Sequence, residues 1–189
     1  MIQARLAASR RAAWVTGLVL GAALLRGLLQ PSGELLSTAV FAACLLWIIG
    51  FEIAQPPEEA RWGRGRAMAA GLLLGAVLLA PNVVSSTSHR SLAGFWSWAA
   101  IAAVIAAVEE IAIRGVLYRR WFEESGTLVA IIATSGVFAL IHLPRYGFAA
   151  MPLDLSVGLA LGGLRALSGR VVPCIVAHTM ADWGAWFWS

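Results

Sequence analysis

Apolar runs long enough to cross a lipid bilayer recur along almost the whole chain and are separated by short stretches of Arg, Pro, Gly and acidic residues. A membrane-spanning helix needs about 20 predominantly apolar residues, and it satisfies its backbone hydrogen bonds within its own segment. Of the 189 residues, 60% are hydrophobic and the mean hydropathy is +0.79, which excludes an ordinary soluble domain. The sequence therefore predicts an all-α, polytopic membrane protein that folds as a bundle of transmembrane helices.

We expect about seven spans, with six or eight as alternatives, in a single integral-membrane domain that covers residues 1–189. Their bounds follow the apolar runs and lie near 13–30, 34–54, 66–84, 93–120, 127–143, 153–168 and 171–188. Most Arg residues fall before or between spans on the side of the N-terminus, and positively charged loops stay in the cytoplasm. The composition, rich in Ala, Gly and Arg, is typical of a bacterial protein. We therefore expect the bacterial inner (cytoplasmic) membrane, with the N-terminus in the cytoplasm.

Charge and cysteine content exclude two classes of function. The net charge of +4 arises from Arg alone, because the chain has no Lys, and these residues lie at the ends of expected spans rather than in one patch. Nucleic acid is therefore not an expected partner, whereas the lipid bilayer is. Cys44 and Cys174 lie in apolar segments without a second Cys nearby, so the sequence predicts neither a disulfide framework nor a thiolate metal site.

Small residues mark a packing surface in the sixth expected span. Gly158, Gly162 and Gly163 follow the spacing at which small residues let two membrane helices approach closely. We interpret them as helix-packing residues rather than as a phosphate-binding loop.

Several ionisable residues lie inside the expected spans, where the insertion of one charge costs about 2.5–3.5 kcal/mol or more. In a chain that keeps such residues, they pair with one another, face a cavity or contact a substrate. We therefore look for functional residues in this set, which comprises Glu109, Glu110, Arg114, His142, His178 and Asp182.

The fourth expected span carries two adjacent carboxylates. Glu110 and Arg114 are four residues apart and share one helix face, where their side chains can form an ion pair. Glu109 points about 100° away from Glu110. We interpret Glu110 and Arg114 as a structural ion pair and Glu109 as the candidate general base. The alternative is that both carboxylates only hold Arg114 in place.

The last span places His178 and Asp182 four residues apart, so both side chains project from one helix face. His142, which ends the fifth span, is a weak signal by itself. One mechanism without a metal fits this set: Glu109 and His142 activate water, and the residues of the last span stabilise the oxyanion. In the alternative, His142, His178 and Asp182 hold a divalent, zinc-like ion whose bound water attacks. Glu109 is then a base or a further ligand.

Three motifs in this order resemble the CAAX-processing and bacteriocin-processing intramembrane endopeptidases (the CPBP or Abi family), relatives of the Rce1-type prenyl-protein protease. They are Glu-Glu-x-x-x-Arg from Glu109, Phe-x-x-x-His ending at His142, and His-x-x-x-Asp from His178. The resemblance runs from about 109 to 182 and includes the turn at 165–173. It implies a catalytic core at about 93–189, in the last four spans.

By this resemblance Glu109 activates the water, His142 assists it, and His178 with Asp182 forms the oxyanion or ligand pair. The resemblance implies an endopeptidase of membrane-associated proteins or peptides, which is of the glutamic type and needs no cofactor. Asp182 stands where the prenyl-protein proteases carry Asn, and Asp suits a metal such as zinc better, so the metal alternative stays open. The substrates could be C-terminal sorting anchors of surface proteins, as for the myxosortase-like members. The alternatives without catalysis are a bacteriocin self-immunity or scaffold protein and a transporter.

Overall fold

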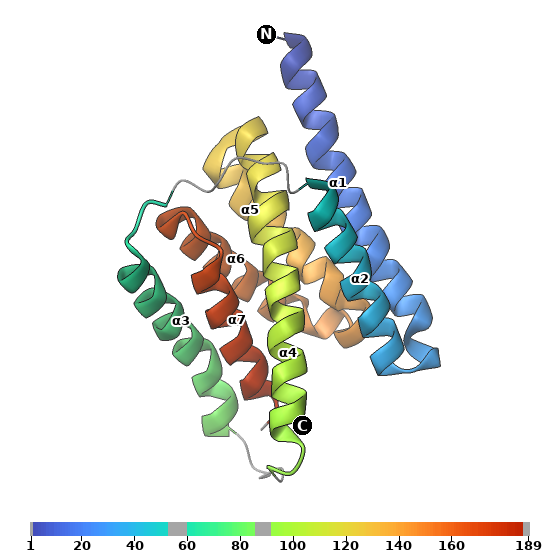
Figure 1. The fold of residues 1–189 in the computed structure, drawn as a ribbon, viewed down its shortest axis with the longest axis vertical. Coiled ribbons are helices and arrows are strands. Elements are labelled where there is room, and N and C mark those ends of the chain that lie inside the picture. Colours follow the sequence, from blue (N-terminus) through green and yellow to red (C-terminus); the bar gives the residue numbers. More distant parts are fainter. Residues whose placement is uncertain (1, 53–59, 86–91, 187–189) are drawn as a thin grey trace. The chain divides into compact units, whose positions relative to one another are not determined.

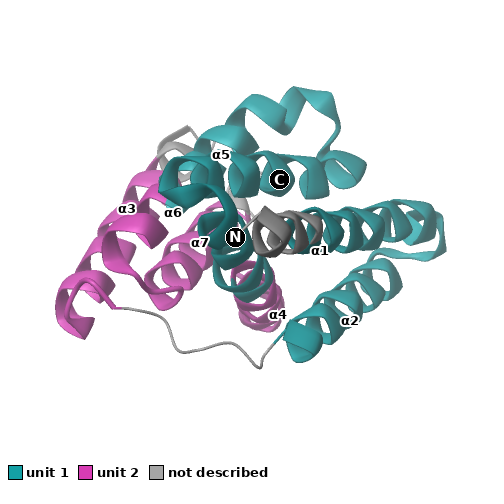
Figure 2. Cartoon of the chain, turned by 90° about the horizontal axis from the view of Figure 1, so that it is seen from above, with its two compact units in different colours: residues 1–56, 111–162 teal, residues 57–110, 163–189 magenta. Residues whose placement is uncertain are grey.

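A computed structural model describes residues 2–52, 60–85 and 92–186, and all regular secondary structure in these residues is helical (Figure 1). This part of the chain confirms the predicted all-α fold. The described residues form two compact units, each built from two separate stretches of sequence (Figure 2). The first unit comprises 1–56 and 111–162, and the second comprises 57–110 and 163–189. The organisation as a single domain stays a prediction.

The first unit begins with a hairpin of two long helices. The turn forms because Pro31 lies within a single 3₁₀ turn and Gly33, with φ of 120°, takes a backbone conformation that residues with a side chain rarely adopt. The remaining helices of this unit belong to its second stretch of sequence, residues 111–162. Its elements are α1 (Ile2–Leu29), η1 (Gln30–Ser32), α2 (Glu34–Glu52), η2 (Ile111–Leu117), α5 (Tyr118–Tyr146), η3 (Phe148–Ala150) and most of α6 (Met151–Ser168).

Ion pairs fasten the helices of the first unit at their ends. Glu52, whose side chain is only 2% exposed, accepts hydrogen bonds from the Arg120 guanidinium, with Nε at 2.9 Å, and from Arg11 Nε at 3.4 Å. The C-terminal end of α2 is thereby tied to α1 and to the start of α5. At the N-terminal end of α2, the Glu34 carboxylate lies 2.6 Å from Nη1 of Arg145, near the end of α5.

Two glycines of α6 contact α5 closely, as the sequence predicts. A Cβ atom on Gly158 would lie 3.0 Å from the Cα atom of Ser135, and one on Gly162 would lie 3.2 Å from the Ile131 side chain. Gly163 has no such neighbour within 4 Å. Gly158 and Gly162 therefore form the packing surface, and Gly163 does not.

The helical run Phe95–Tyr146 contains two irregularities. It comprises α4 (Phe95–Glu110), the π-helix η2, and α5. Within α5, Gly126 leaves the helical conformation, with φ of 82° and ψ of −177°. Because this break falls between the expected spans 93–120 and 127–143, the run accounts for both of them.

The second unit is built on a close contact between α3 (Arg64–Ser85) and α7 (Val172–Ala185), which lie side by side in Figure 1. A Cβ atom on Gly71 would lie only 2.6 Å from the Pro173 carbonyl oxygen, and one on Gly75 would lie 3.2 Å from the Cα atom of Ala177. Glycine is thus required in α3 for the two backbones to approach this closely.

Aromatic side chains close the end of the second unit where α4 begins and α7 ends. Phe95 and Trp186 are buried there, and Trp98 and Trp183 pack against them. The indole N–H of Trp183 donates a hydrogen bond to the Ala99 carbonyl at 3.1 Å. This cluster holds α4 against α7 and so fixes the two helices that carry most of the candidate site residues.

Four helical stretches among the described residues are long and apolar enough to cross a membrane: Arg11–Ser32, Glu34–Glu52, Phe95–Tyr146 and Phe148–Ser168. Large apolar side chains such as Leu28 and Leu73 are exposed on the helices, as expected for surfaces in contact with lipid. The chain is thus an integral membrane protein. The count of about seven spans is not confirmed, and residues 53–54 and 187–188 of the expected spans lie outside the described residues.

Candidate active site

The last turn of α4 and the middle of α7 bring four of the sequence-predicted residues together within the second unit. Glu109 and Glu110 end α4, and His178 and Asp182 lie one turn apart on α7. The two helices pack against each other. The cluster is therefore a property of one unit and of two helices that are far apart in sequence.

His178 is the centre of this cluster, with carboxylates near both of its ring nitrogens. Its Nδ1 atom lies 3.0 Å from Oε1 of Glu110, within hydrogen-bond distance. Its Nε2 atom lies 3.9 Å from Oε2 of Glu109 and 3.6 Å from Oδ1 of Asp182. Three carboxylates thus surround one imidazole.

The cluster is buried on one side and open on the other. The side chains of Glu110, His178 and Glu109 are 0%, 4% and 5% exposed, whereas that of Asp182 is 38% exposed. Buried carboxylates are stable only when a proton, a cation or hydrogen bonds compensate them. Asp182 marks the side from which water can approach.

The hydrogen bond to Glu110 determines what each nitrogen of His178 can do. An ionised carboxylate only accepts hydrogen bonds, so Nδ1 carries the hydrogen that it donates to Glu110. Nε2 is then the atom that faces Glu109 and Asp182. This nitrogen can hold a proton between the two carboxylates, donate to a developing oxyanion, or bind a metal ion.

The donor set also suits a divalent metal ion. Ligands of a tetrahedral zinc ion lie about 2.0–2.1 Å from the metal and hence about 3.4 Å from one another, close to the 3.6 Å and 3.9 Å separations around Nε2. Nε2 of His178 could bind such an ion together with a carboxylate oxygen of Glu109 or of Asp182, and Glu110 would orient the imidazole. A bound ion would supply Lewis-acid activation of water.

Two predicted residues, His142 and Arg114, belong to the first unit. Nδ1 of His142, on α5, donates to the Phe138 carbonyl oxygen at 2.8 Å. Arg114, in the π-helix η2, is fully buried and donates to the Gly158 carbonyl oxygen at 3.2 Å. The part that His142 takes in the site stays a prediction, as does the ion pair of Arg114 with the carboxylate at position 110.

The sequence did not indicate two features of this region. It assigned Glu110 to Arg114 only, whereas the Glu110 carboxylate lies within hydrogen-bond distance of His178, 68 positions further along the chain. It also did not indicate the π-helix Ile111–Leu117 that starts directly after the two carboxylates. Such segments are rare and frequently occur at functional sites. No local motif reports the contact of Glu110 with His178, because it depends on how two distant helices pack.

The comparison with known protein families finds a match over the C-terminal part of the chain. Residues 91–184 match the family described as Rce1-like, type II CAAX prenyl endopeptidase Rce1-like. The matched stretch contains every candidate site residue named above. No curated protein and no solved structure matches the chain.

Proposed function

Because the chain belongs, through residues 91–184, to the Rce1-like family of type II CAAX prenyl endopeptidases, we propose that it hydrolyses peptide bonds at the membrane with a water molecule that Glu109 activates. Family membership makes the chain a hydrolase of the CAAX-protease type. The assignment of the catalytic steps to individual residues is our proposal.

The contacts of His178 are the observation that carries this mechanism. The 3.9 Å between its Nε2 atom and Oε2 of Glu109 exceeds a direct hydrogen bond. The two atoms are therefore not bonded to each other directly, and a reacting oxygen can approach each of them. Glu109 takes the proton of the attacking water, and His178 donates to the oxygen that gains negative charge at the scissile carbonyl.

The other residues support these two groups. Glu110 holds the His178 ring in place through Nδ1, and Asp182 borders Nε2 on the open side of the cluster. We assign to His142 the role that the family resemblance implies, namely to assist Glu109 in activating water. Since His142 uses Nδ1 for a backbone carbonyl, it would act through Nε2. The proposed reaction is of the glutamic type and runs through no metal ion.

The depth of the cluster favours a membrane-embedded or membrane-associated substrate. Glu109 and His178 lie inside helices that are apolar over most of their length, so the scissile bond must come to them within or near the bilayer. We propose that the substrates include C-terminal membrane anchors of surface proteins, in the manner of the myxosortase-like enzymes. The proposed location is the bacterial inner membrane with the N-terminus in the cytoplasm, in line with the distribution of Arg.

The test compares Glu109→Gln and His178→Ala with wild type in two assays. One assay follows cleavage of a prenylated CAAX peptide in detergent micelles. The other compares protein termini in membrane and secreted fractions of cells that carry each variant. Both variants should insert normally and lose cleavage. His89→Ala, which removes a histidine outside the described residues, is the control and should cleave like wild type.

Wild-type cleavage by Glu109→Gln would overturn the mechanism. Loss of cleavage in the control as well would show that the assay reports expression rather than chemistry. The two assays also separate the substrate classes, because anchor trimming changes termini in cells whether or not the prenylated peptide is cleaved.

A further inference from the structure

The imidazole of His142 lies in a column of stacked side chains on α5. The Phe138 ring precedes it by one helical turn, with ring centroids 4.5 Å apart and planes at 46°. The Tyr146 ring follows it by one turn, with centroids 5.8 Å apart and planes almost parallel at 13°. Residues four apart on a helix are neighbours on its surface, so α5 itself builds this column.

A guanidinium group lies at each end of the column. The Cζ atom of Arg114 is 4.4 Å from the centroid of the Phe138 ring, and that of Arg145 is 5.1 Å from the centroid of the Tyr146 ring. Both distances are typical of cation–π contacts. All five side chains belong to the first unit.

The hydrogen bond and the stacking restrict different motions of His142. The bond from Nδ1 to the Phe138 carbonyl, at 2.8 Å, selects the tautomer and leaves Nε2 as the atom that can exchange a proton with a reacting group. One hydrogen bond does not stop the ring from turning about the N–O direction. The almost parallel ring of Tyr146, with its centroid 5.8 Å from that of the imidazole, opposes that rotation.

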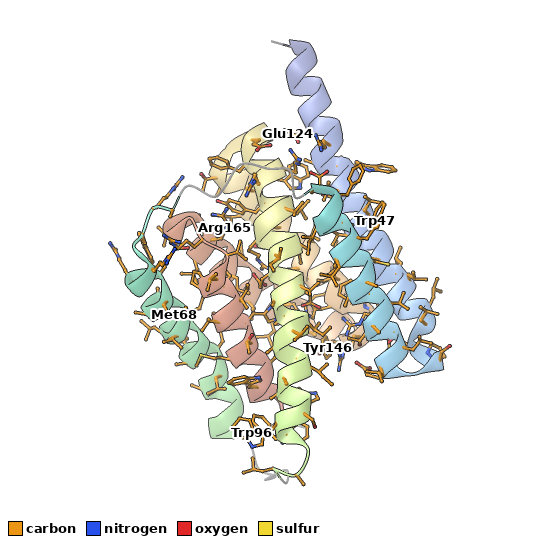
Figure 3. All side chains as sticks on the ribbon, viewed as in Figure 1. Trp47, Met68, Trp96, Glu124, Tyr146 and Arg165 are labelled. Atoms are coloured by element: carbon orange, nitrogen blue, oxygen red, sulfur yellow. The ribbon has the colours of Figure 1, made fainter. Side chains whose placement is uncertain are left out.

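The turn that carries Tyr146 is itself held in place. Gly147, with φ of 74°, ends α5, and its N–H donates to the Leu143 carbonyl at 2.9 Å. Arg145 binds Glu34 at the start of α2, with Nη1 and Oε1 2.6 Å apart. Tyr146, which is labelled in Figure 3, is 52% exposed. Its ring therefore contributes little to the core. A ring that is fixed but not buried suits a role in orienting its neighbour.

We propose that Tyr146 is a positioning residue for peptide hydrolysis, whose ring keeps Nε2 of His142 directed at the reacting water. The inference rests on the proposed function, in which His142 assists Glu109. Misplacement of a catalytic group by about 1 Å can cost about 100-fold in rate. Tyr146→Ala should therefore lower kcat by about 100-fold and leave KM nearly unchanged. Tyr146→Phe, which keeps the ring, should restore the wild-type kcat.

The first unit offers a matched control on α2. Phe51 stacks on Trp47 four residues earlier, with centroids 5.8 Å apart and planes at 16°, and is 65% exposed. Phe51→Ala thus removes a ring of similar geometry and exposure away from His142. It should leave both kcat and KM at wild-type values.

The test of the positioning role of Tyr146 measures kcat and KM on a prenylated CAAX peptide for these variants and for His142→Ala. An inactive His142→Ala with wild-type kcat in Tyr146→Ala would overturn the inference and leave the proposed function intact. Wild-type kcat in His142→Ala would overturn the role of His142 and this inference together. If Tyr146→Ala does not accumulate, Tyr146→Leu replaces it, because Leu keeps apolar bulk without a planar ring. A wild-type kcat in that variant would likewise overturn the inference.

Discussion

The Nδ1 atom of His178 lies 3.0 Å from Oε1 of Glu110, a carboxylate with no exposed surface. This contact joins α7 to the end of α4 and leaves Nε2 of the imidazole facing Glu109 and Asp182. The orientation of the central histidine therefore depends on a residue that the sequence indicates only as the partner of an arginine.

Replacement of Glu110 tests whether this residue orients the His178 ring. Glu110→Ala removes the acceptor for Nδ1–H, and the loss of such an orienting partner typically costs about 10–100-fold in activity. Glu110→Gln keeps an acceptor oxygen and should lose less. Cleavage rates of a prenylated CAAX peptide give the comparison, and a wild-type rate in Glu110→Ala would contradict the proposed orienting role.

Asp182→Asn should retain at least the wild-type rate, because an amide can donate a hydrogen bond to an oxyanion and an ionised carboxylate cannot. An oxyanion donor is worth about 10²–10³ in kcat, so Asp182→Ala should be about 10²-fold slower than the Asn variant. The rates are measured on purified protein in micelles. If Asp182 held a metal instead, Asn would weaken binding and the rate would fall with the metal content.

Metal removal distinguishes the glutamic mechanism from a metal-dependent one. The separations of 3.6 Å and 3.9 Å around Nε2 of His178 are close to the ligand spacing of a zinc ion, whereas the proposed reaction runs through no metal. We expect dialysis against 1,10-phenanthroline to leave the cleavage rate unchanged, with less than one equivalent of metal per chain by elemental analysis. Loss of activity that returns on addition of zinc would replace the glutamic mechanism with a metal-dependent one.

Gly71→Ala should destabilise the second unit. Its Cβ atom would overlap the Pro173 backbone of α7, and overpacking of this kind costs about 1–3 kcal/mol. Gly65→Ala is the matched control in α3, because nothing lies within 4 Å of its added Cβ atom. Thermal unfolding in detergent should show a lower Tm for the first variant only. Equal Tm values would mean that the two helices can separate slightly at no cost.

Helix bounds were the most predictable part of the fold, because they depend on local signals. The expected span 34–54 corresponds to α2, which starts at Glu34 directly after Gly33. The span 153–168 ends with α6 at Ser168, directly before Gly169, whose φ is 69°. Helices often end at a glycine with positive φ, because a residue without a Cβ atom adopts that conformation easily. Their positions can be read from the sequence.

Partners of buried polar groups were less predictable. The i,i+4 spacing correctly placed His178 and Asp182 on one face, because spacing alone determines it. The contact of Glu110 with His178 depends on the packing of α4 against α7, which no local pattern encodes. The glycines of α6 were recognised as a packing surface, but the closer contact through Gly71 was not, since the sequence does not say which helix faces α3.

The same backbone contact between α3 and α7 restricts how a substrate can arrive. Where Gly71 and Gly75 meet Pro173 and Ala177, the gap is too narrow for a methyl group and hence for a lipid tail or a second helix. A protein that diffuses in the plane of the bilayer therefore cannot slip sideways between these two helices toward His178. In the proposed mechanism the substrate must therefore reach His178 along another face of α7, because the contact between α3 and α7 closes this route.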